Sequence, residues 1–397
     1  MRVSLSQKLR NLDVSVFVEL FDAKNLVAEK GMSIIDLSVG SPDLPPPPVV
    51  MQTIQKWAAD QTKYGYTITA LPEFKQAVAS FYENRYGVSL NPEREVLQLM
   101  GSQDGLAHLA MTLIDPGDVV LVPDPGYPIF ETGVRLAGGT PYKMPLLEEN
   151  GFLPRLEEIP SEVLAKAKLM ILNYPGNPVT AMAGREFFEE VVRFAKKHEL
   201  IVAHDFTYSE LVYDGRKAVS FLSVPGAKEV GVEFNSLSKT FNMAGCRIGY
   251  VTGYEDVLAG LALYMSHTHY GIFYPVQKAA EAVLRMPEET IRSQRLVYES
   301  RRDVLVSRLK EMGWEVSVPP ATMYVWTRIP EGWTSEAFVF RLLEETGVVL
   351  TPGRAFGERG EGFVRISMVQ PSEMLLEAAM RIGRFLSANR QLKGSVR

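Results

Sequence analysis

The sequence predicts an α/β fold in two parts: a large domain around a mostly parallel, doubly wound sheet, and a small α+β domain. Three observations lead to this prediction. Short apolar runs alternate with helical stretches from about residue 50 to residue 287. After Pro287 a long charged helix is followed by mixed strands and helices. The length of 397 residues corresponds to about 2.6 domains of roughly 150 residues, and 46% hydrophobic residues suit a folded globular chain.

The large domain is expected to cover residues 46–287. Its apolar runs are bounded by Gly, Pro or Asp, as in strands that helices cover on both faces. These runs are Val96–Met100, Val119–Pro123, Leu169–Tyr174, Leu200–His204, Val230–Phe234 and Arg247–Thr252. The helical stretches between most of them are Asp104–Leu113, Ile129–Ala137, Arg185–His198 and Glu255–Tyr264. In such sheets ligands bind beyond the carboxyl ends of the strands, so the residues after each run are candidates for a site.

The small domain is expected to combine both chain ends, residues 1–45 and 288–397. A helix over Val14–Glu29 and a strand over Ile34–Val39 are predicted near the start. The prolines of Pro45–Pro48 exclude helix and regular sheet, which predicts a rigid crossing between the domains. The later elements are expected to be the helix Glu288–Met312, the strands Glu315–Val318 and Tyr324–Arg328, the helix Ser335–Thr346, the strands Val348–Thr351 and Phe363–Met368, and the helix Glu373–Ala388.

Composition excludes several classes of function. Lys and Arg number 42 against 47 Asp and Glu, a formal net charge of −5, so neither a nucleic-acid nor an anionic-membrane surface is expected. The single cysteine, Cys246, makes no internal disulfide and no multi-cysteine metal site. No apolar run is long enough to span a membrane and no signal peptide is recognised, so we expect a cytoplasmic protein. The pair His267 and His269 has no clustered acid beside it in the sequence, so no metal site is predicted.

The segment Ser236-Leu237-Ser238-Lys239 follows one of the apolar runs. A lysine directly after a strand points toward the ligand crevice, where desolvation makes it a nucleophile toward carbonyls; a solvated surface lysine is the alternative. Ser236, Ser238 and Arg247 together suit a phosphate dianion. The Ser-x-x-Lys spacing also occurs in serine acyl-transferring enzymes, but the Ser-Asp-Asn and Lys-Thr-Gly motifs of that group are absent from the sequence.

Four other strand ends carry polar or aromatic residues. The segment Gly101–Gly105 opens a helix whose free N–H groups favour an anion. Tyr127 offers a ring for stacking, Asn177 a fixed polar group, and Asp205 and Tyr208 a carboxylate and a phenol; taken singly, each also fits an ordinary turn or helix cap. With the lysine and the phosphate-binding groups, these residues form the set that pyridoxal 5'-phosphate requires.

The stretch from Ser236 to Tyr250 resembles the fold-type I pyridoxal-phosphate enzymes of the class I/II aminotransferase family, and the resemblance extends from about Ile34 through Met368. It implies that Lys239 forms a Schiff base with the cofactor. It implies a phosphate site made of Ser236, Ser238, Arg247 and the backbone amides of Ser102 and Gln103. It also implies that Tyr127 stacks on the ring, that Asn177 and Tyr208 hydrogen-bond the ring hydroxyl oxygen, and that Asp205 pairs with the pyridinium.

The resemblance implies a substrate site and a homodimer as well. Arg365 matches the arginine that binds the substrate α-carboxylate, with Asn177 and the backbone of Gly40 as further contacts. Tyr64 matches a tyrosine that reaches the phosphate of the neighbouring subunit. The implied reaction is amino transfer between an L-amino acid and a 2-oxo acid, with glutamate and 2-oxoglutarate as one pair, by a ping-pong mechanism with Lys239 moving the α-proton. A pyridoxal-phosphate-dependent C–S β-lyase and a non-catalytic regulator are the alternatives.

Within the family, three stretches are most similar to the LL-diaminopimelate aminotransferase group: Val122–Pro128, Met144–Pro154 and Val349–Gly353. Two positions depart from that group. Gln103 stands where a lysine is common, and a tyrosine is common near Ser15, where the local run is Val14–Phe17. Loss of polar partners for the distal end of diaminopimelate predicts weaker selection for it. Alanine or aspartate-type donors are therefore candidates, in amino acid biosynthesis.

Overall fold

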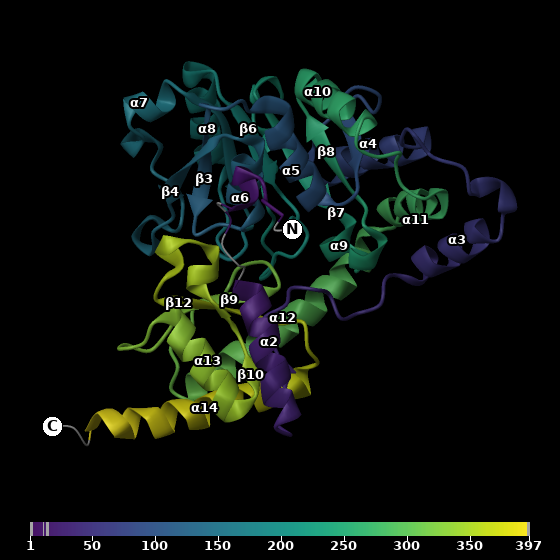
Figure 1. The fold of residues 1–397 in the computed structure, drawn as a ribbon. Coiled ribbons are helices and arrows are strands. Elements are labelled where there is room, and N and C mark those ends of the chain that lie inside the picture. The colour runs from purple at the N-terminus through teal and green to yellow at the C-terminus, as the bar shows by residue number, and fades with distance from the viewer. Residues whose placement is uncertain (1–2, 11, 13–15, 395–397) are drawn as a thin grey trace.

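A computed structural model describes residues 3–10, 12 and 16–394, and a seven-stranded sheet forms its centre (Figure 1). The strand order is β2-β8-β7-β6-β5-β3-β4; β8 runs antiparallel to both neighbours and every other pair is parallel. The strands are β2 (Val96–Leu99), β3 (Val119–Asp124), β4 (Thr140–Pro145), β5 (Ala167–Asn173), β6 (Ile201–Asp205), β7 (Gly231–Ser236) and β8 (Gly249–Gly253). The predicted mostly parallel α/β fold is confirmed.

Helices cover both faces of this sheet (Figure 1). One face packs against α5 (Ser102–Leu113), α6 (Ile129–Ala137) and α10 (Glu255–Ser266), and the other against α4 (Pro72–Tyr86), α8 (Arg185–His198) and α11 (Tyr274–Leu284). Successive side chains of β3 alternate between the two cores, since Val120 and Val122 lie in one and Leu121 in the other. Burial on both faces is the physical reason for the continuous apolar runs.

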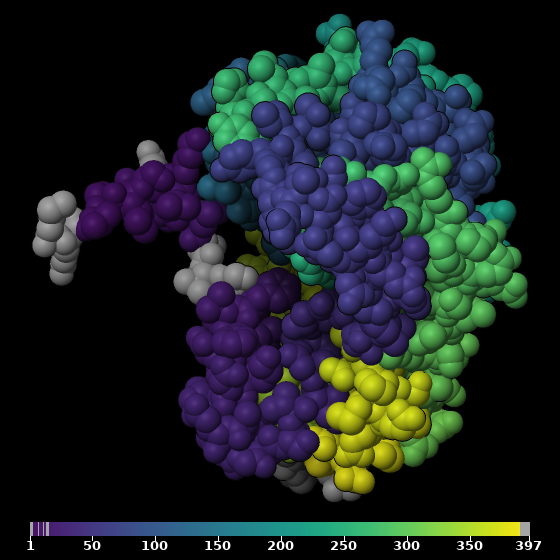
Figure 2. Space-filling view, turned by 90° about the vertical axis from the view of Figure 1, so that its right-hand side faces the viewer, coloured from purple at the N-terminus to yellow at the C-terminus, as the bar shows by residue number. Residues whose placement is uncertain are grey.

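A second unit holds segments from both ends of the chain, but the predicted placement of residues 1–45 in it is wrong for Gln7–Arg10, a short helix that contacts α6 of the large domain. Its three-stranded antiparallel sheet has the order β11-β12-β9, and β1 pairs in parallel with β10. Its elements are α2 (Val16–Glu29), β1 (Ile35–Asp36), α12 (Glu288–Glu311), β9 (Tyr324–Arg328), α13 (Ser335–Thr346), β10 (Val348–Val349), β11 (Thr351–Pro352), β12 (Phe363–Ser367) and α14 (Ser372–Gly394). Figure 2 shows later parts of the purple N-terminal segment and the yellow C-terminal segment on this same lower part of the surface, whereas the first purple residues project beside the upper part. The unit has its own apolar core, which supports the other predicted domain limits; these limits stay a prediction.

Two predictions about local structure are wrong. The prolines do not exclude a helix throughout, because α3 (Pro48–Ala58) begins at the last of them; a proline lacks only an N–H that the first turn leaves unpaired. The expected strand Glu315–Val318 is absent, since no backbone ladder forms there.

Several elements escaped prediction. The edge strand β4 is only partly buried, so no continuous apolar run marks it. The helices α3, α4 and α11 were not predicted, nor were the short helices α1 (Gln7–Arg10), α7 (Ser161–Leu164) and α9 (Leu237–Thr240). No helix in the described ranges is long and apolar enough to cross a membrane.

Candidate active site

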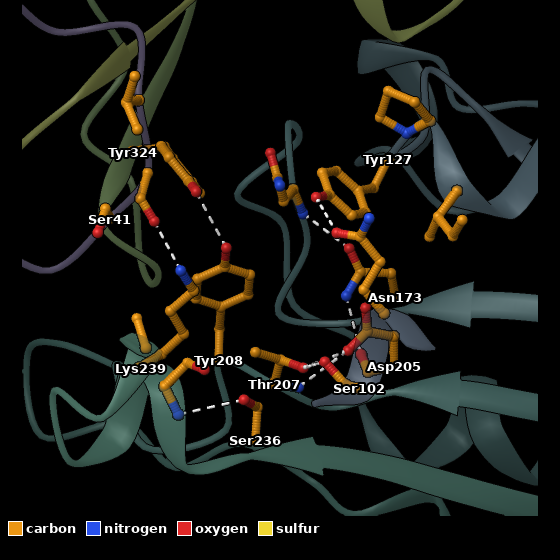
Figure 3. Close-up of a pocket in the computed structure, with 18 of the residues that line it drawn as sticks. Ser41, Ser102, Tyr127, Asn173, Asp205, Thr207, Tyr208, Ser236, Lys239 and Tyr324 are labelled. Atoms are coloured by element: carbon orange, nitrogen blue, oxygen red, sulfur yellow. Dashed lines mark hydrogen bonds between the residues drawn. The ribbon is translucent and has the colours of Figure 1, made fainter. Parts of the chain in front are cut away.

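A cavity of about 550 Å³ lies at the carboxyl ends of the central strands, where the second unit closes over the sheet. Twelve of the predicted site residues line it: Gly40, Ser102, Gln103, Tyr127, Asn177, Asp205, Tyr208, Ser236, Ser238, Lys239, Arg247 and Arg365. In Figure 3, Lys239 and Tyr208 lie on one side of the cavity, and Asp205, Ser102 and Tyr127 lie on the other. The fold therefore brings together residues that are far apart in the sequence.

One end of the cavity is an anion site. Helix α5 begins at Ser102 with no side-chain cap, so its first N–H groups are available to a ligand. The guanidinium of Arg247 lies against Gly101, whose φ is +91°, and a Cβ at Gly101 would overlap it. Arg247 donates to the Ala244 carbonyl at 2.9 Å, and no carboxylate pairs with it within the described ranges. The Ser236 hydroxyl accepts from the Ser238 N–H at 3.1 Å, beside the same space.

Lys239 reaches the cavity from α9, directly after β7. Its Nζ donates to the Gly40 carbonyl at 2.6 Å, which directs the amine toward the segment that carries Ser41 (Figure 3). Burial lowers the pKa of the Lys239 amine, and the charges of Arg365 and Arg247 lower it further, against the opposite effect of Tyr324. The neutral, nucleophilic form of the amine is therefore easier to reach than in a solvated lysine.

Asp205 ends β6 and is buried at the opposite side of the cavity. Its Oδ1 accepts from the N–H of Thr207 at 3.1 Å and from the Thr207 hydroxyl at 2.6 Å. Burial raises the pKa of the Asp205 carboxyl, while the Thr207 hydrogen bonds oppose the rise. A cationic partner such as a protonated ring nitrogen would favour the ionised carboxylate again. Oδ2 is the oxygen that Thr207 leaves for such a partner.

Three tyrosines surround the space between the lysine and the carboxylate. The Tyr127 hydroxyl donates to Gln103 Oε1 at 2.8 Å, which fixes the ring at the cavity wall. The hydroxyls of Tyr208 and Tyr324 lie 3.0 Å apart. Burial raises the pKa of the Tyr208 phenol well above 10, and Tyr324 raises it further, so Tyr208 is a proton donor at neutral pH.

Arg365 on β12 is buried at the mouth of the second unit. It donates to Asn177 Oδ1 at 2.7 Å and to the Ser38 carbonyl at 2.6 Å, and its guanidinium carbon lies 4.3 Å from the centroid of the Tyr324 ring. Its Nε is buried and has no hydrogen-bond partner within the described ranges. Arg365 also lines the cavity, where its positive charge is available to an anionic ligand.

Eleven lining residues were not predicted, among them Phe17, Asn173, Thr207 and Tyr324. Asn173 joins two strand ends, since its Nδ2 donates to the Asp205 carbonyl and its Oδ1 accepts the Asn177 N–H, both at 2.8 Å. Asn173 could have been predicted as a site residue from the sequence, because it lies near the end of an apolar run. Tyr324 begins a strand of the second unit, and its meeting with Gly40 depends on tertiary structure alone; a Cβ at Gly40 would overlap the Tyr324 hydroxyl.

One predicted site residue lies elsewhere. Tyr64 is 63% exposed, and its hydroxyl donates to the Ala58 carbonyl at 2.8 Å. It does not line the cavity, and its reach into a neighbouring subunit stays a prediction. Ser15, near the position of the common tyrosine, falls outside the described residues.

The groups present fit pyridoxal 5'-phosphate. A phosphate needs several donors and a positive charge, which the start of α5 and Arg247 offer beside a backbone too close for a side chain. A protonated pyridine nitrogen needs a carboxylate, and a carbonyl carbon needs an amine; Asp205 and Lys239 lie on different sides of the cavity (Figure 3). When bound, the cofactor withdraws electrons from the carbon that carries the substrate amine.

Comparisons with known proteins agree with this chemistry. The family model "Aminotransferase class I and II" matches residues 32–382. LL-diaminopimelate aminotransferase of Moorella thermoacetica is 46% identical over 96% of this chain and 98% of its own, and that of Aquifex aeolicus is 44% identical over 95% and 98%.

Two solved structures are similar along nearly the whole chain. The structure of substrate-bound BacF from Bacillus subtilis has a TM-score of 0.93 at 39% identity, covering 97% of this chain and 98% of its own. A probable N-succinyldiaminopimelate aminotransferase from Thermus thermophilus has a TM-score of 0.89 at 42% identity, covering 93% and 100%. The family match, the relatives and the site agree: this chain belongs to the class I and II aminotransferases and is a pyridoxal-phosphate-dependent transferase.

Proposed function

We propose that the enzyme moves an amino group between an L-α-amino acid and a 2-oxo acid by a ping-pong mechanism, with glutamate and 2-oxoglutarate as one pair. One observation carries this proposal. The backbone of residues 38–40 contacts the side chains of both Lys239 and Arg365. The Gly40 carbonyl accepts from Lys239 Nζ and the Ser38 carbonyl accepts from Arg365, each at 2.6 Å. A single cavity with one carboxylate-binding arginine suits donor and acceptor in turn.

The cofactor contacts are assigned as follows. Ser236, Ser238, Arg247 and the amides of Ser102 and Gln103 bind the phosphate. Tyr127 stacks on the ring, and Asn177 and Tyr208 donate to the ring oxygen. Asp205 holds the proton of the ring nitrogen. Two observations support these roles. No side chain caps the start of α5, and Thr207 contacts only the Oδ1 oxygen of Asp205.

Lys239 is assigned the proton transfer. Its lowered pKa leaves the amine able to take the substrate α-proton and to return it to the neighbouring carbon. A general base of this kind contributes typically about 10²–10⁴-fold to the rate. Arg365 binds the α-carboxylate and so fixes the α-hydrogen in front of the amine, while the Tyr208–Tyr324 pair keeps a phenol proton beside the ring oxygen.

The substrate side chain meets a nearly neutral wall. Phe17, Val39 and Ile129 are apolar, and Ser41 and Gln103 are neutral polar residues. Apart from the four charged residues already assigned, no charged side chain in the described ranges lines the cavity. Several relatives are named LL-diaminopimelate aminotransferase, which makes that diamino acid a candidate. We propose that alanine-type donors are preferred over it, because its distal ammonium and carboxylate find no charged partner here.

The test is a panel of single amino acids. The cofactor-loaded enzyme is mixed with L-glutamate, L-alanine, L-aspartate or LL-diaminopimelate without an acceptor, and the bound-cofactor absorbance is followed. Glutamate and alanine are expected to change it fastest. Preference for LL-diaminopimelate by tenfold or more would contradict the proposed selectivity, and pyruvate and ammonia released without an acceptor would favour the β-lyase.

We also propose a homodimer. Three large apolar side chains at alternate positions are exposed beside the large domain: Tyr64, Tyr66 and Ile68, at 63%, 83% and 70%. Tyr64 and Tyr66 contact the rings of Phe273 and Tyr270, at centroid distances of 5.3 and 5.2 Å. An exposed apolar patch of this kind marks a protein interface. Light scattering is expected to give twice the mass of one chain, and a monomer at micromolar concentration would refute the dimer.

A further inference from the structure

Three potential metal-ligating side chains converge outside the active site. Asp104 and His108 lie one turn apart on α5, and His269 joins them from the segment after α10. Asp104 Oδ2 lies 3.4 Å from His108 Nδ1 and 4.0 Å from His269 Nε2. One ligand atom from each residue lies within 4.8 Å of the other two. The sequence showed no acid beside His269; the fold supplies one from a distant helix.

The three residues are partly buried, and four of their polar atoms are shielded from solvent without a hydrogen-bond partner in the described ranges. Asp104 Oδ2, His108 Nδ1 and both ring nitrogens of His269 are affected. Buried polar groups in native proteins are hydrogen-bonded or coordinate a metal, because an unpaired group costs about 1–3 kcal/mol. The remaining contacts are between rings, His108 lying 4.9 Å from the Tyr264 ring centroid and 6.2 Å from that of His269. The cluster is packed, but its polar atoms are not satisfied.

We propose that Asp104, His108 and His269 form a binding site for a divalent transition-metal ion, with Zn²⁺ as the ion that best suits the ligands. Two imidazole nitrogens and one carboxylate oxygen are a common zinc ligand set, and the fourth position is left for water. Zinc–ligand distances of about 2.0–2.2 Å place tetrahedral ligand atoms about 3.3 Å apart. The Asp104–His108 pair at 3.4 Å already meets this spacing, whereas Asp104 and His269, at 4.0 Å, would have to move closer together.

The surroundings offer a path to the site. His269 also lines a second cavity, of about 440 Å³, between α10 and the segment Ile68–Ala70. An ion on its way to the cluster could pass through this space.

The cluster lies between the start of α5 and the segment that contains Thr67, so a bound ion would link these two parts of the chain. Asp104 follows Ser102 and Gln103, which line the active-site cavity. On the other side, the Ile272 carbonyl accepts from the Thr67 hydroxyl, and a Cβ at Gly271 would overlap the Thr67 carbonyl. A bound ion would therefore join the start of α5 to the segment that carries Tyr64. The metal site itself does not depend on the roles proposed for these residues in catalysis.

The test measures metal directly. Cofactor-loaded enzyme is titrated with zinc chloride by calorimetry, and bound zinc is counted by elemental analysis after dialysis. We expect one zinc per chain for the wild type. His269→Ala and Asp104→Asn each remove one ligand and are expected to weaken binding at least about 10–100-fold, since loss of even an indirect partner has that effect.

His267→Ala is the matched control. It lies on the same segment as His269, is exposed, and is not part of the cluster, so it is expected to keep full zinc binding. Asp104→Asn keeps the side-chain size and guards against a folding defect in the alanine variant. A wild type that binds no zinc in one-to-one ratio overturns the proposal, as does equal affinity in wild type and both ligand variants. Neither readout requires transamination, so the site and the proposed function fail independently.

Discussion

Arg365→Lys perturbs the substrate side of the cavity with the least change in charge. Arginine presents several donors in a fixed fork, whereas lysine offers one compact ammonium group. In the structure Nη1 donates to Asn177 and Nη2 to Ser38, and the buried Nε has no hydrogen-bond partner within the described ranges. The substitution keeps a positive charge but loses the second hydrogen bond to a carboxylate.

The magnitude follows from that lost hydrogen bond. A hydrogen bond to a charged group contributes about 1.5–3 kcal/mol. At about 1.36 kcal/mol for each factor of ten, kcat/KM for an amino acid is expected to fall about 10- to 150-fold. A matched amine without the α-carboxylate never makes this bond. Its already low kcat/KM is expected to change much less.

The assay compares L-alanine with ethylamine in half-reactions of the wild type and the variant. The kcat/KM for L-alanine divided by that for ethylamine is expected to fall about 10- to 150-fold in Arg365→Lys. Arg354→Lys, at an exposed position outside the cavity, is the control and is expected to keep the ratio. If both substrates lose activity equally, Arg365 has a structural role, and the carboxylate assignment is refuted.

Three further predictions concern the cofactor site and the core. Gly101→Ala is expected to displace the guanidinium of Arg247 and to weaken cofactor binding about 10- to 150-fold in a fluorescence titration. The control is Gly31→Ala, which has a similar φ but no neighbouring atoms, and it is expected to leave cofactor binding unchanged. The raised pKa of Asp205 makes its charged form unfavourable in the folded cofactor-free enzyme, so stability is lost as pH rises through that pKa. The melting temperature of cofactor-free Asp205→Asn is therefore expected to rise relative to wild type over that range, and a pH-independent difference would contradict this. Glu233→Ala is expected to lower the unfolding free energy by about 3–5 kcal/mol, against under about 0.5 for the exposed Glu162→Ala, because its buried carboxylate accepts hydrogen bonds from several elements.

The strand ends of the site were predictable because their signals are local. Lys239 and Asp205 each follow an apolar run bounded by polar residues, and parallel strands bring such ends to one edge of the sheet. The family resemblance then extended the prediction to Arg365, which nothing in its neighbourhood marks as a carboxylate ligand.

The remainder depends on contacts between distant segments. Tyr324 reaches Tyr208 from the other unit, and Asp104 reaches His269 from another helix. No spacing in the sequence encodes these meetings. The strand expected over Glu315–Val318 failed for a related reason, since Val316 is buried and Val318 exposed without a partner strand that pairs with this segment.

The central claim is that one cavity holds amino donor and acceptor in turn, with Lys239 as the base. Its most direct test is a single mixing of cofactor-loaded enzyme with L-glutamate in the absence of a 2-oxo acid. We predict one 2-oxoglutarate per active site, no ammonia, and a reaction at least about 10²–10⁴-fold slower in Lys239→Ala. Continued turnover without an acceptor, or a wild-type rate in the variant, would contradict the claim.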